Sequence, residues 1–377
     1  MSEKTQIAEG VTDAITEFYG DKEMRWYQIA SRNQAIEALE EGVSRILIVQ
    51  PTGSGKTLTI VSSLSDPRFR RALGVTDDRP LRVLFLAHKH RLLSQADKTF
   101  VGDCNVDLIL QSAFSGIPDE VVEEGWDVTI IDEAHHEAMM SIQLQLETIG
   151  ERPVIGLTAT PDRADGCVIK FEVIVNPISR EQAVEEGWLA ETELNTFIDI
   201  PIKDKTDIIR RIITEYGVEM EQVMIFVRTK AEVGAITEFL VEQGHEAIAI
   251  TNQTEVQLDN LLNDFSDKKV QFLVNCNKIN EGVDVAGCTD VILGRQFGSY
   301  PQLNQVIGRA ARPDSACRVW ELINPLSARN MDTTVVVGTP ARHRLISQAR
   351  GEWVERQFEY VSNTRAIDDV LTMGRTS

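Results

Sequence analysis

The sequence lacks the usual signs of a secreted or membrane-embedded protein. No apolar run is long enough to cross a bilayer, and the opening residues Met1-Ser-Glu-Lys-Thr-Gln contain no signal-peptide core. The 5 cysteines form no Cys-x-x-Cys pair, which argues against a disulfide framework or a zinc site. These absences predict a cytoplasmic protein with no membrane partner.

Basic residues are also scarce. The 38 lysines and arginines are outnumbered by 58 acidic residues, which gives a net charge of -20. Nucleic-acid-binding proteins usually carry a basic surface, and this chain as a whole repels phosphate. One basic stretch runs from Arg68 to Arg91, and it has two interpretations. It could form a local track for nucleic acid, or it could be ordinary charge on a solvated surface.

Short apolar runs of strand type alternate with helical patterns along the chain. The first series of expected strands covers 45–50, 82–87, 106–111, 127–131 and 153–157. The second series covers 193–199, 222–227, 246–250, 270–274, 290–294 and 317–323. Helical patterns lie between most of them, for example at 229–243 and 255–265. Such alternation predicts mostly parallel sheets flanked by helices, and two series of similar size predict two α/β domains.

The domain boundaries follow from this pattern. We expect an N-terminal helical extension over 1–20, a first domain over 21–180, a linker over 181–204, a second domain over 205–335, and a C-terminal helix and tail over 336–377. The join is expected where Pro177, Gly187 and Pro201 interrupt the chain. The C-terminal helix is expected because 340–360 reads as amphipathic.

A glycine-rich loop follows the first expected strand. It approximates the phosphate-binding pattern G-x-x-x-x-G-K-[ST], with Pro51 in place of the first glycine. Glycines let backbone N–H groups face phosphate oxygens, and the helix that follows adds its positive end. Lys56 would contact the β- and γ-phosphates, and the Thr57 hydroxyl would hold Mg²⁺. Against a chance glycine turn, we favour an ATP site made of Pro51, Thr52, Gly53, Ser54, Gly55, Lys56 and Thr57.

Two acidic residues follow the expected strand 127–131. The carboxyl ends of parallel strands are where open α/β sheets place their ligands. Asp132 could hold Mg²⁺ directly or through water, and Glu133 could polarise the water that attacks the γ-phosphate. His135 comes next, and it is either a functional residue or a local cap at the start of a helix.

A third group of residues lies near the end of the second α/β unit. Gln305, Arg309 and Arg312 would share one face if they stood on one helix. Arginines that face a nucleotide bound to another domain can stabilise the charge of the γ-phosphate when the domains close. The alternative is a surface helix with ordinary salt bridges, and the combination with the first two motifs favours the catalytic interpretation.

These motifs stand in the order found in superfamily 2 helicases and translocases of the DEAH-box type. Over residues 22–325 the chain resembles their XPB/UvsW-like branch, in a compact phage- or bacterial-type form. The resemblance implies two tandem RecA-like domains, ATP and Mg²⁺ as cofactors, and the cytoplasm of a bacterium or of a phage-infected host cell. Arg25-Trp-Tyr-Gln28 resembles an element that recognises adenine, so Gln28 would contact the base with help from Arg25.

The remaining matches imply contacts with nucleic acid and coupling between sites. Resemblance to motifs Ia and IV implies contacts with the nucleic-acid backbone by His88, Lys89, Arg91, Arg228 and Thr229. Resemblance to motifs II and III implies coupling of the ATP site to the strand-binding face by His135, Thr158 and Thr160. Resemblance to motif V implies that Gly282 and Asp284 approach the nucleotide.

The expected function is that of a nucleic-acid-dependent ATPase that moves on nucleic acid and unwinds or remodels it, with DNA favoured over RNA. The alternatives are a duplex DNA translocase that does not separate strands, an RNA helicase, and a nucleotide-controlled interaction protein. The net charge of -20 predicts that the chain alone binds nucleic acid weakly, and a protein partner that recruits it to nucleic acid is therefore also expected.

Overall fold

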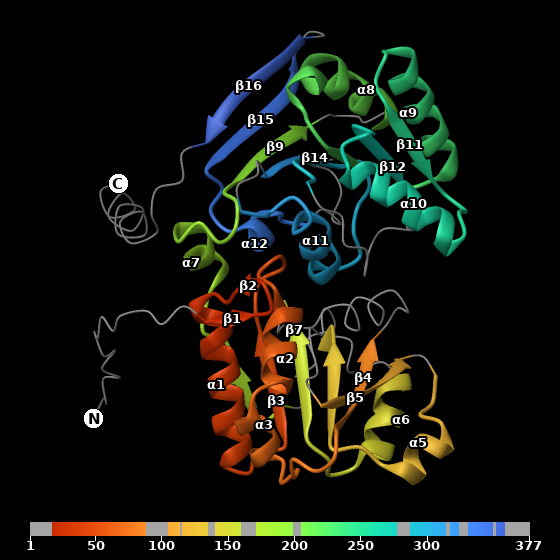
Figure 1. Ribbon diagram of the computed structural model, residues 1–377. Helices are drawn as coiled ribbons and strands as arrows, with labels where there is room; N and C mark the ends of the chain where they lie inside the picture. The colour runs from red at the N-terminus through yellow and green to blue at the C-terminus, as the bar shows by residue number, and fades with distance from the viewer. Residues whose placement is uncertain are drawn as a thin grey trace, which may run out of the picture.

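The structure is a computed structural model, and it shows two α/β lobes joined by a short connector (Figure 1). It describes residues 17–87, 105–113, 115–134, 140–159, 171–198, 205–276, 287–313, 317–323, 331–349 and 352–358. The connector contains helix α7 (Arg180–Glu185). Within these described ranges, no helix is both long and apolar enough to span a membrane.

Lobe 1 is built on a parallel sheet of six strands. Their order is β5 (Val106–Ser112), β4 (Leu81–Ala87), β6 (Val128–Asp132), β7 (Val154–Thr158), β3 (Arg45–Val49) and β8 (Val173–Val175). Its helices are α1 (Trp26–Glu40), α2 (Lys56–Leu64), α3 (Pro67–Ala72), α5 (Asp119–Glu124) and α6 (Met140–Ile149). A two-stranded hairpin of β1 (Phe18–Tyr19) and β2 (Lys22–Glu23) precedes α1.

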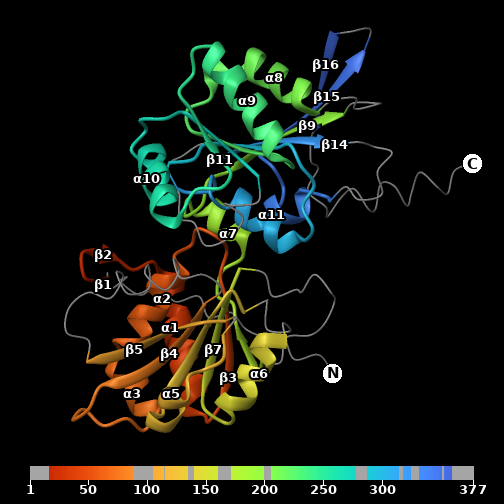
Figure 2. The same ribbon diagram turned by 90° about the vertical axis from the view of Figure 1, so that its right-hand side faces the viewer.

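Both faces of this sheet are buried, which explains its continuous apolar strands. Ile46 and Ile48 of β3 pack in one hydrophobic cluster with α1, α2 and α3. The intervening Leu47 packs in another cluster on the opposite face, with residues of α5 and α6. Figure 2 shows these two helix layers on either side of the strands. Alternate side chains of a strand point to opposite faces, so a doubly covered strand must be apolar throughout.

Lobe 2 is built on a sheet of eight strands. Their order is β11 (Ala247–Ile250), β12 (Phe272–Asn275), β10 (Val223–Phe226), β13 (Asp290–Leu293), β14 (Cys317–Ile323), β9 (Thr192–Ile198), β15 (Arg342–Ala349) and β16 (Glu352–Phe358). Its helical segments are α8 (Lys205–Tyr216), η2 (Gly217–Glu219), α9 (Lys230–Glu242), α10 (Glu255–Ser266), α11 (Tyr300–Ile307) and α12 (Thr334–Val337). All pairs are parallel except β15 with β16.

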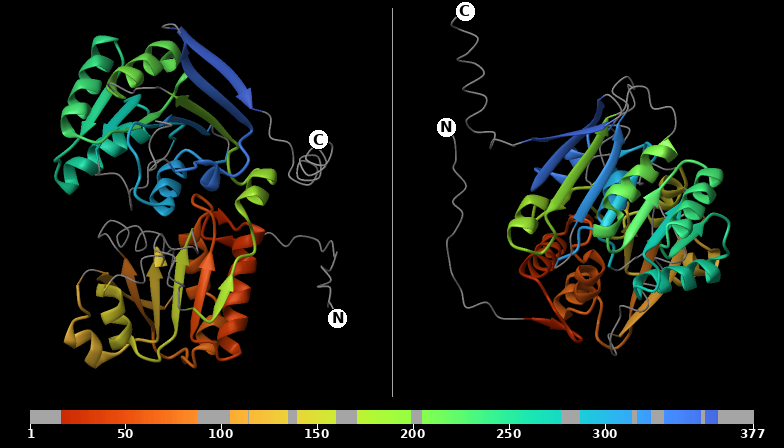
Figure 3. Two further views of the ribbon diagram at one scale, coloured as in Figure 1. Left: turned by 180° about the vertical axis from the view of Figure 1, so that it is seen from behind. Right: turned by 90° about the horizontal axis from the view of Figure 1, so that it is seen from above.

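The expected fold class is confirmed: two tandem RecA-like domains, each a mostly parallel sheet flanked by helices. The predicted C-terminal helix is wrong. Residues 342–349 and 352–358 form an antiparallel hairpin that extends the lobe 2 sheet, as the views in Figure 3 show. Trp353 packs edge-on against Phe197 of β9, with ring centroids 5.2 Å apart. An amphipathic pattern shows only that one side of a segment is apolar, and here β15 pairs with β9 on one edge and with β16 on the other instead of forming the hydrogen bonds of a helix.

Two domain boundaries also change. Lobe 2 begins with β9, at Thr192, inside the expected linker 181–204, because β9 lies between β14 and β15. The expected helical extension over 1–20 includes strand β1 at Phe18–Tyr19, while 1–16 lie outside the described residues. The connector between the sheets is therefore short, and α7 is its one regular element among the residues described there.

Candidate ATP site between the lobes

The glycine-rich loop has the geometry of a phosphate cradle. It links β3 to α2, and Gly53 and Gly55 have φ values of 85° and 90°, which side-chain-bearing residues rarely adopt. Lys56 is the first residue of α2, so its amide and that of Thr57 lie at the positive end of the helix. In the described part of the chain, the hydroxyl oxygens of Thr52 and Ser54 are buried without a hydrogen-bond partner. Such groups normally have one, and phosphate oxygens would supply it.

The start of α1 holds this loop in shape. The Tyr27 hydroxyl donates to the Ser54 carbonyl oxygen at 2.8 Å, and Gln28 Nε2 donates to the same oxygen at 2.9 Å. Glycine is favoured at position 55 because its φ is 90°, and a Cβ there would also displace Gln28 Nε2, which would lie 2.5 Å away. Tyr27 is fully buried, and burial raises the pKa of its hydroxyl, which keeps it a neutral donor. Tyr27 is a site residue to which the sequence analysis gave no role.

Gln28 is engaged by protein groups at both ends of its amide. Its Oε1 accepts from the backbone N–H of Arg25 at 2.9 Å, and the backbone N–H of Gln28 donates to the Arg25 carbonyl oxygen at 2.9 Å. The Arg25 guanidinium donates to the Tyr27 hydroxyl at 2.7 Å and lies 5.2 Å from the ring centroid of Trp188. The structure thus places Arg25 and Gln28 beside the loop, and their contact with adenine stays a prediction.

Gln50 was also missed as a site residue. It is fully buried between helices, where its Nε2 donates to the Ser31 hydroxyl at 2.8 Å and its Oε1 accepts from the Thr59 hydroxyl at 3.1 Å. Its backbone N–H donates to the carbonyl oxygen of Thr158 at 3.0 Å. Thr158 is the buried last residue of β7, and it was expected to couple the ATP site to the face that binds nucleic acid. It is bonded directly to Gln50, the residue that precedes Pro51 of the glycine-rich loop.

The acid pair lies at the carboxyl end of β6, on the same edge of the sheet as the loop. Burial and, to a smaller extent, the charge of Glu133 raise the pKa of Asp132 to about 7, although the charge of Lys56 opposes the shift. The charges of Glu133 and Lys56 thus both act on the Asp132 carboxyl. Glu133 has a left-handed backbone with φ 53°, and its N–H donates to Asp132 Oδ1 at 3.0 Å.

The donor set fits Mg²⁺ only in combination with a nucleotide. Within the described ranges, no group of three or more His, Cys, Asp or Glu side chains could hold a metal ion. The ligands predicted from the sequence are the Thr57 hydroxyl and the Asp132 carboxylate, both hard oxygen donors, and this assignment stays a prediction. Mg²⁺ commonly keeps few protein ligands and takes phosphate oxygens for the rest. Loss of the Asp132 proton would accompany its binding.

Lobe 2 contacts the phosphate loop through the turn after α11. A Cβ on Gly308 would lie 2.6 Å from Thr52 Cβ, and a Cβ on Gly53 would lie 3.5 Å from the Ala311 carbonyl oxygen. Gln305 and Arg309 are 8% exposed, and Arg312 is half-buried. The expected shared helix face is wrong, because α11 ends at Ile307 and both arginines follow it. The N–H groups of Arg309 and Ala310 bond three residues back, so the chain tightens into a turn.

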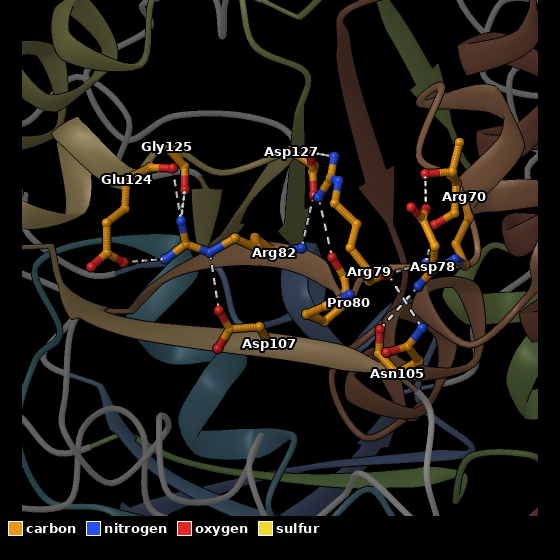
Figure 4. Close-up of polar contacts among 11 residues, drawn as sticks. Arg70, Asp78, Arg79, Pro80, Arg82, Asn105, Asp107, Glu124, Gly125 and Asp127 are labelled. Atoms are coloured by element: carbon orange, nitrogen blue, oxygen red, sulfur yellow. Dashed lines mark hydrogen bonds and ion pairs between the residues drawn. The ribbon is translucent and has the colours of Figure 1, made fainter.

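The basic stretch that begins at Arg68 is largely committed to structural contacts, as Figure 4 shows. Arg79 pairs with Asp127 at 2.6 Å, and Arg82 pairs with Asp107 at 3.0 Å and Glu124 at 2.7 Å. Arg79 and Arg82 lie at the amino ends of the strands, opposite the edge that carries the phosphate loop.

Several predicted residues lie outside the described ranges: His88, Lys89, Arg91, His135, Thr160, Gly282 and Asp284. Of the residues predicted to contact nucleic acid, Arg228 and Thr229 lie within the described ranges. The Thr229 hydroxyl caps α9, and the Glu232 carboxylate accepts from the N–H groups of both residues at 2.8 Å. Both precede a helix at the carboxyl edge of the lobe 2 sheet, and their contact with nucleic acid stays a prediction.

Comparison with known families agrees with this division into lobes. Residues 21–112 match the family described as type III restriction enzyme, res subunit, and residues 204–314 match the helicase conserved C-terminal domain. The two lobes are superfamily 2 helicase domains. The phosphate loop of the first helicase domain and the turn after α11 of the second are the parts that meet at the candidate site.

The relatives of this helicase core are distant in sequence. It is 23% identical to the putative ATP-dependent helicase IRC3 of Saccharomyces cerevisiae, covering 95% of this chain and 60% of that protein. It is 25% identical to a subunit of the type I restriction enzyme EcoAI of Escherichia coli, covering 80% and 46%. It is 23% identical to the DNA 3'-5' translocase XPB2 of Sulfurisphaera tokodaii, covering 83% and 84%. The chain thus spans less than two thirds of the first two relatives.

Solved structures share the fold. A fragment of a putative HsdR subunit of a type I restriction enzyme from Vibrio vulnificus superposes with a TM-score of 0.69 at 23% identity, covering 88% of this chain and 70% of that chain. The type ISP restriction-modification enzyme LlaBIII superposes with a TM-score of 0.65 at 15% identity, covering 87% and 32%. Both likenesses concern the arrangement of the two helicase domains.

Proposed function

We propose that this chain is an ATP-dependent DNA helicase or translocase of the XPB/UvsW-like, DEAH-box type. One observation carries the proposal: the turn that holds Arg309 and Arg312 contacts the phosphate loop of the other lobe. A nucleotide at the loop would therefore lie between the two lobes. Its hydrolysis would be coupled to their closure and opening, which is how a two-lobed motor converts chemistry into movement.

The described residues would divide the chemistry between the lobes. The loop amides and Lys56 would hold the β- and γ-phosphates, while Thr57 and Asp132 would hold Mg²⁺, which supplies charge neutralisation at the phosphates. Glu133 would orient and polarise the attacking water. Gln305, Arg309 and Arg312 would face the γ-phosphate from lobe 2, where the arginines stabilise its developing charge. Closure would be required because these residues lie on different lobes.

DNA is favoured over RNA by the relatives. XPB2 is described as a DNA translocase, and LlaBIII was solved bound to DNA. The strand would lie across both lobes and would be held through its phosphates, without strong sequence preference. The net charge of -20 and the structural pairing of Arg79 and Arg82 both predict weak binding by this chain alone. A protein partner that recruits it is consistent with that weakness.

The deciding experiment measures ATPase rate against single-stranded, duplex and branched DNA and RNA at several stated salt concentrations. Stimulation by DNA supports the proposal, and equal or greater stimulation by RNA would favour an RNA helicase. Strand-displacement and triplex-displacement assays then separate unwinding from movement on intact duplex. An ATPase rate that no nucleic acid changes would instead support a nucleotide-controlled interaction protein.

Two variants test the assigned roles. Lys56→Ala should abolish hydrolysis while leaving the fold intact, since it removes the cation at the β- and γ-phosphates. Arg309→Ala should retain ATP binding and lose hydrolysis, because its charge matters for the transition state. Undiminished turnover of either variant would remove that residue from the catalytic site.

A further inference from the structure

The connector helix α7 is attached to both lobes. At its first residue, the Arg180 guanidinium donates to the Val337 carbonyl oxygen and to the Thr192 hydroxyl, each at 3.2 Å, and both acceptors belong to lobe 2. Burial lowers the pKa of Arg180, but a guanidinium stays protonated in proteins and so donates both bonds as a cation. One end of the connector is thus bonded to the sheet of lobe 2.

The other end of α7 is attached to lobe 1 by Glu186. Its Oε2 accepts from the indole N–H of Trp26 at 2.6 Å and from that of Trp188 at 2.8 Å. Its Oε1 accepts from Gln182 Nε2 at 2.8 Å. Partial burial would raise the pKa of Glu186, but these three hydrogen bonds outweigh it and lower the pKa. The carboxylate therefore joins α1 of lobe 1 to the connector with charge-assisted bonds.

A continuous set of contacts leads from this carboxylate to the phosphate loop. Trp188 lies under the Arg25 guanidinium, which donates to the Tyr27 hydroxyl, which in turn donates to the Ser54 carbonyl oxygen at 2.8 Å. Tyr27 also packs with Leu189 in a small buried cluster. Leu189 Cδ2 lies 3.4 Å from the Cβ position of Gly53. A change in the shape of the loop would move Tyr27 and Leu189, and both contact the connector or belong to it.

We propose that Glu186 is a positioning residue that latches the connector to α1 and thereby transmits nucleotide binding to the relative position of the lobes. This inference rests on the proposed function. The latch touches no reacting atom. Without it, the protein should still bind nucleotide, but binding should no longer cause the lobes to close. Glu186 and Trp26 are both exposed, so substitutions there leave the cores of the lobes unchanged.

The test uses Glu186→Ala and Glu186→Gln, with Glu185→Ala, at the neighbouring last residue of α7, as the matched control. Glu186→Ala should lower the DNA-stimulated kcat by about fivefold or more, the usual size of coupling between sites, with the Kd for AMP-PNP changed less than about twofold. Glu186→Gln, which keeps a carbonyl acceptor without charge, should lie between the alanine variant and the wild type. Glu185→Ala should match the wild type.

A spectroscopic measurement tests the latch without turnover. Because Trp26 and Trp188 both donate to Glu186, AMP-PNP binding should change tryptophan emission in the wild type. The change should be lost in Glu186→Ala and reduced in Trp26→Phe. A wild-type kcat and emission change in Glu186→Ala would overturn the proposal, as would a loss of nucleotide affinity at unchanged kcat. If DNA fails to stimulate the wild type, the proposed function fails, while the emission result still decides the latch.

Discussion

The contact between Gly308 and Thr52 makes a sharp prediction about Gly308→Ala. Gly308 has φ -59° and ψ -12°, a right-handed conformation that any residue can adopt. The glycine is therefore required by the other lobe and not by its own backbone. A Cβ there would lie 2.6 Å from Thr52 Cβ, whereas carbon atoms in contact stay about 3.5–4.0 Å apart. The lobes would have to separate by about 1 Å to accept one methyl group.

The expected effect is a loss of hydrolysis without a loss of stability. A displacement of about 1 Å between reacting groups can cost on the order of 100-fold in rate, so kcat should fall by about that factor. Within lobe 2 the new methyl meets the Asn304 carbonyl oxygen at 3.0 Å, which a small shift relieves. Replacement of glycine in a compatible conformation commonly stabilises by about 0.4–1 kcal/mol, so Tm should not decrease. Nucleotide binding by lobe 1 should change little.

The assay combines single-turnover ATPase rates, AMP-PNP titration and thermal unfolding. The matched control is the same substitution in a Thr52→Gly background, where Cβ and Cγ2 of residue 52 are both absent. There Gly308→Ala should cost little, whereas in a Thr52→Ala background the clashing Cβ remains and the cost should persist. Wild-type kcat in Gly308→Ala, or an equal loss in all three backgrounds, would refute the steric reasoning.

Three further outcomes follow from the site and its surroundings. Lys56→Ala should lose hydrolysis with an unchanged Tm, and a lower Tm would mean that Lys56 also supports the fold. Because burial raises the pKa of Asp132 from 3.8 to about 7, the unfolded chain releases this proton first, and the ligand-free protein loses stability as pH rises through that window. Asp132→Asn should therefore raise the free energy of unfolding at pH 8 without Mg²⁺ by at most about 4 kcal/mol, at 1.36 kcal/mol per pKa unit, and should have little effect near pH 3.5. Urea unfolding at both pH values measures this, and an equal gain at both would contradict it. Arg82→Met should lower the free energy of unfolding in urea by about 1–2 kcal/mol and leave the salt dependence of DNA binding unchanged. If DNA binding by this variant depended less steeply on salt concentration, Arg82 would contact the DNA backbone.

The periodic and local parts of the fold could be predicted from the sequence. Each strand expected in the two series is observed, within two residues at either end, because a strand buried on both faces must be apolar along its whole length. The phosphate loop could be recognised because its chemistry is contained in one short segment between a strand and a helix. The short strand β8 and the hairpin β15–β16 were not predicted, since their backbones are paired by β3 and β9, which are distant in sequence.

The roles of the arginines show where such prediction ends. Arg79 and Arg82 belong to a stretch that looks like a basic track, yet the structure gives them partners such as Asp127 and Asp107. Net charge in a sequence window contains no information about which carboxylate a guanidinium will meet. The same limit applies to the helix expected at Arg309 and Arg312, which ends early, at Ile307, as the chain turns against the other lobe.

A glycine-rich loop, an acid pair and a group of arginines could be recognised from the residues alone, as could the two-lobed α/β fold to which they belong. These features depend on residue type and spacing within single segments. The contacts of Gly308 with Thr52, of Tyr27 with Ser54 and of Glu186 with Trp26 of α1 are visible only in the folded chain. Such contacts link segments that are far apart in the chain, and they exist only once both sheets have formed and the lobes lie together.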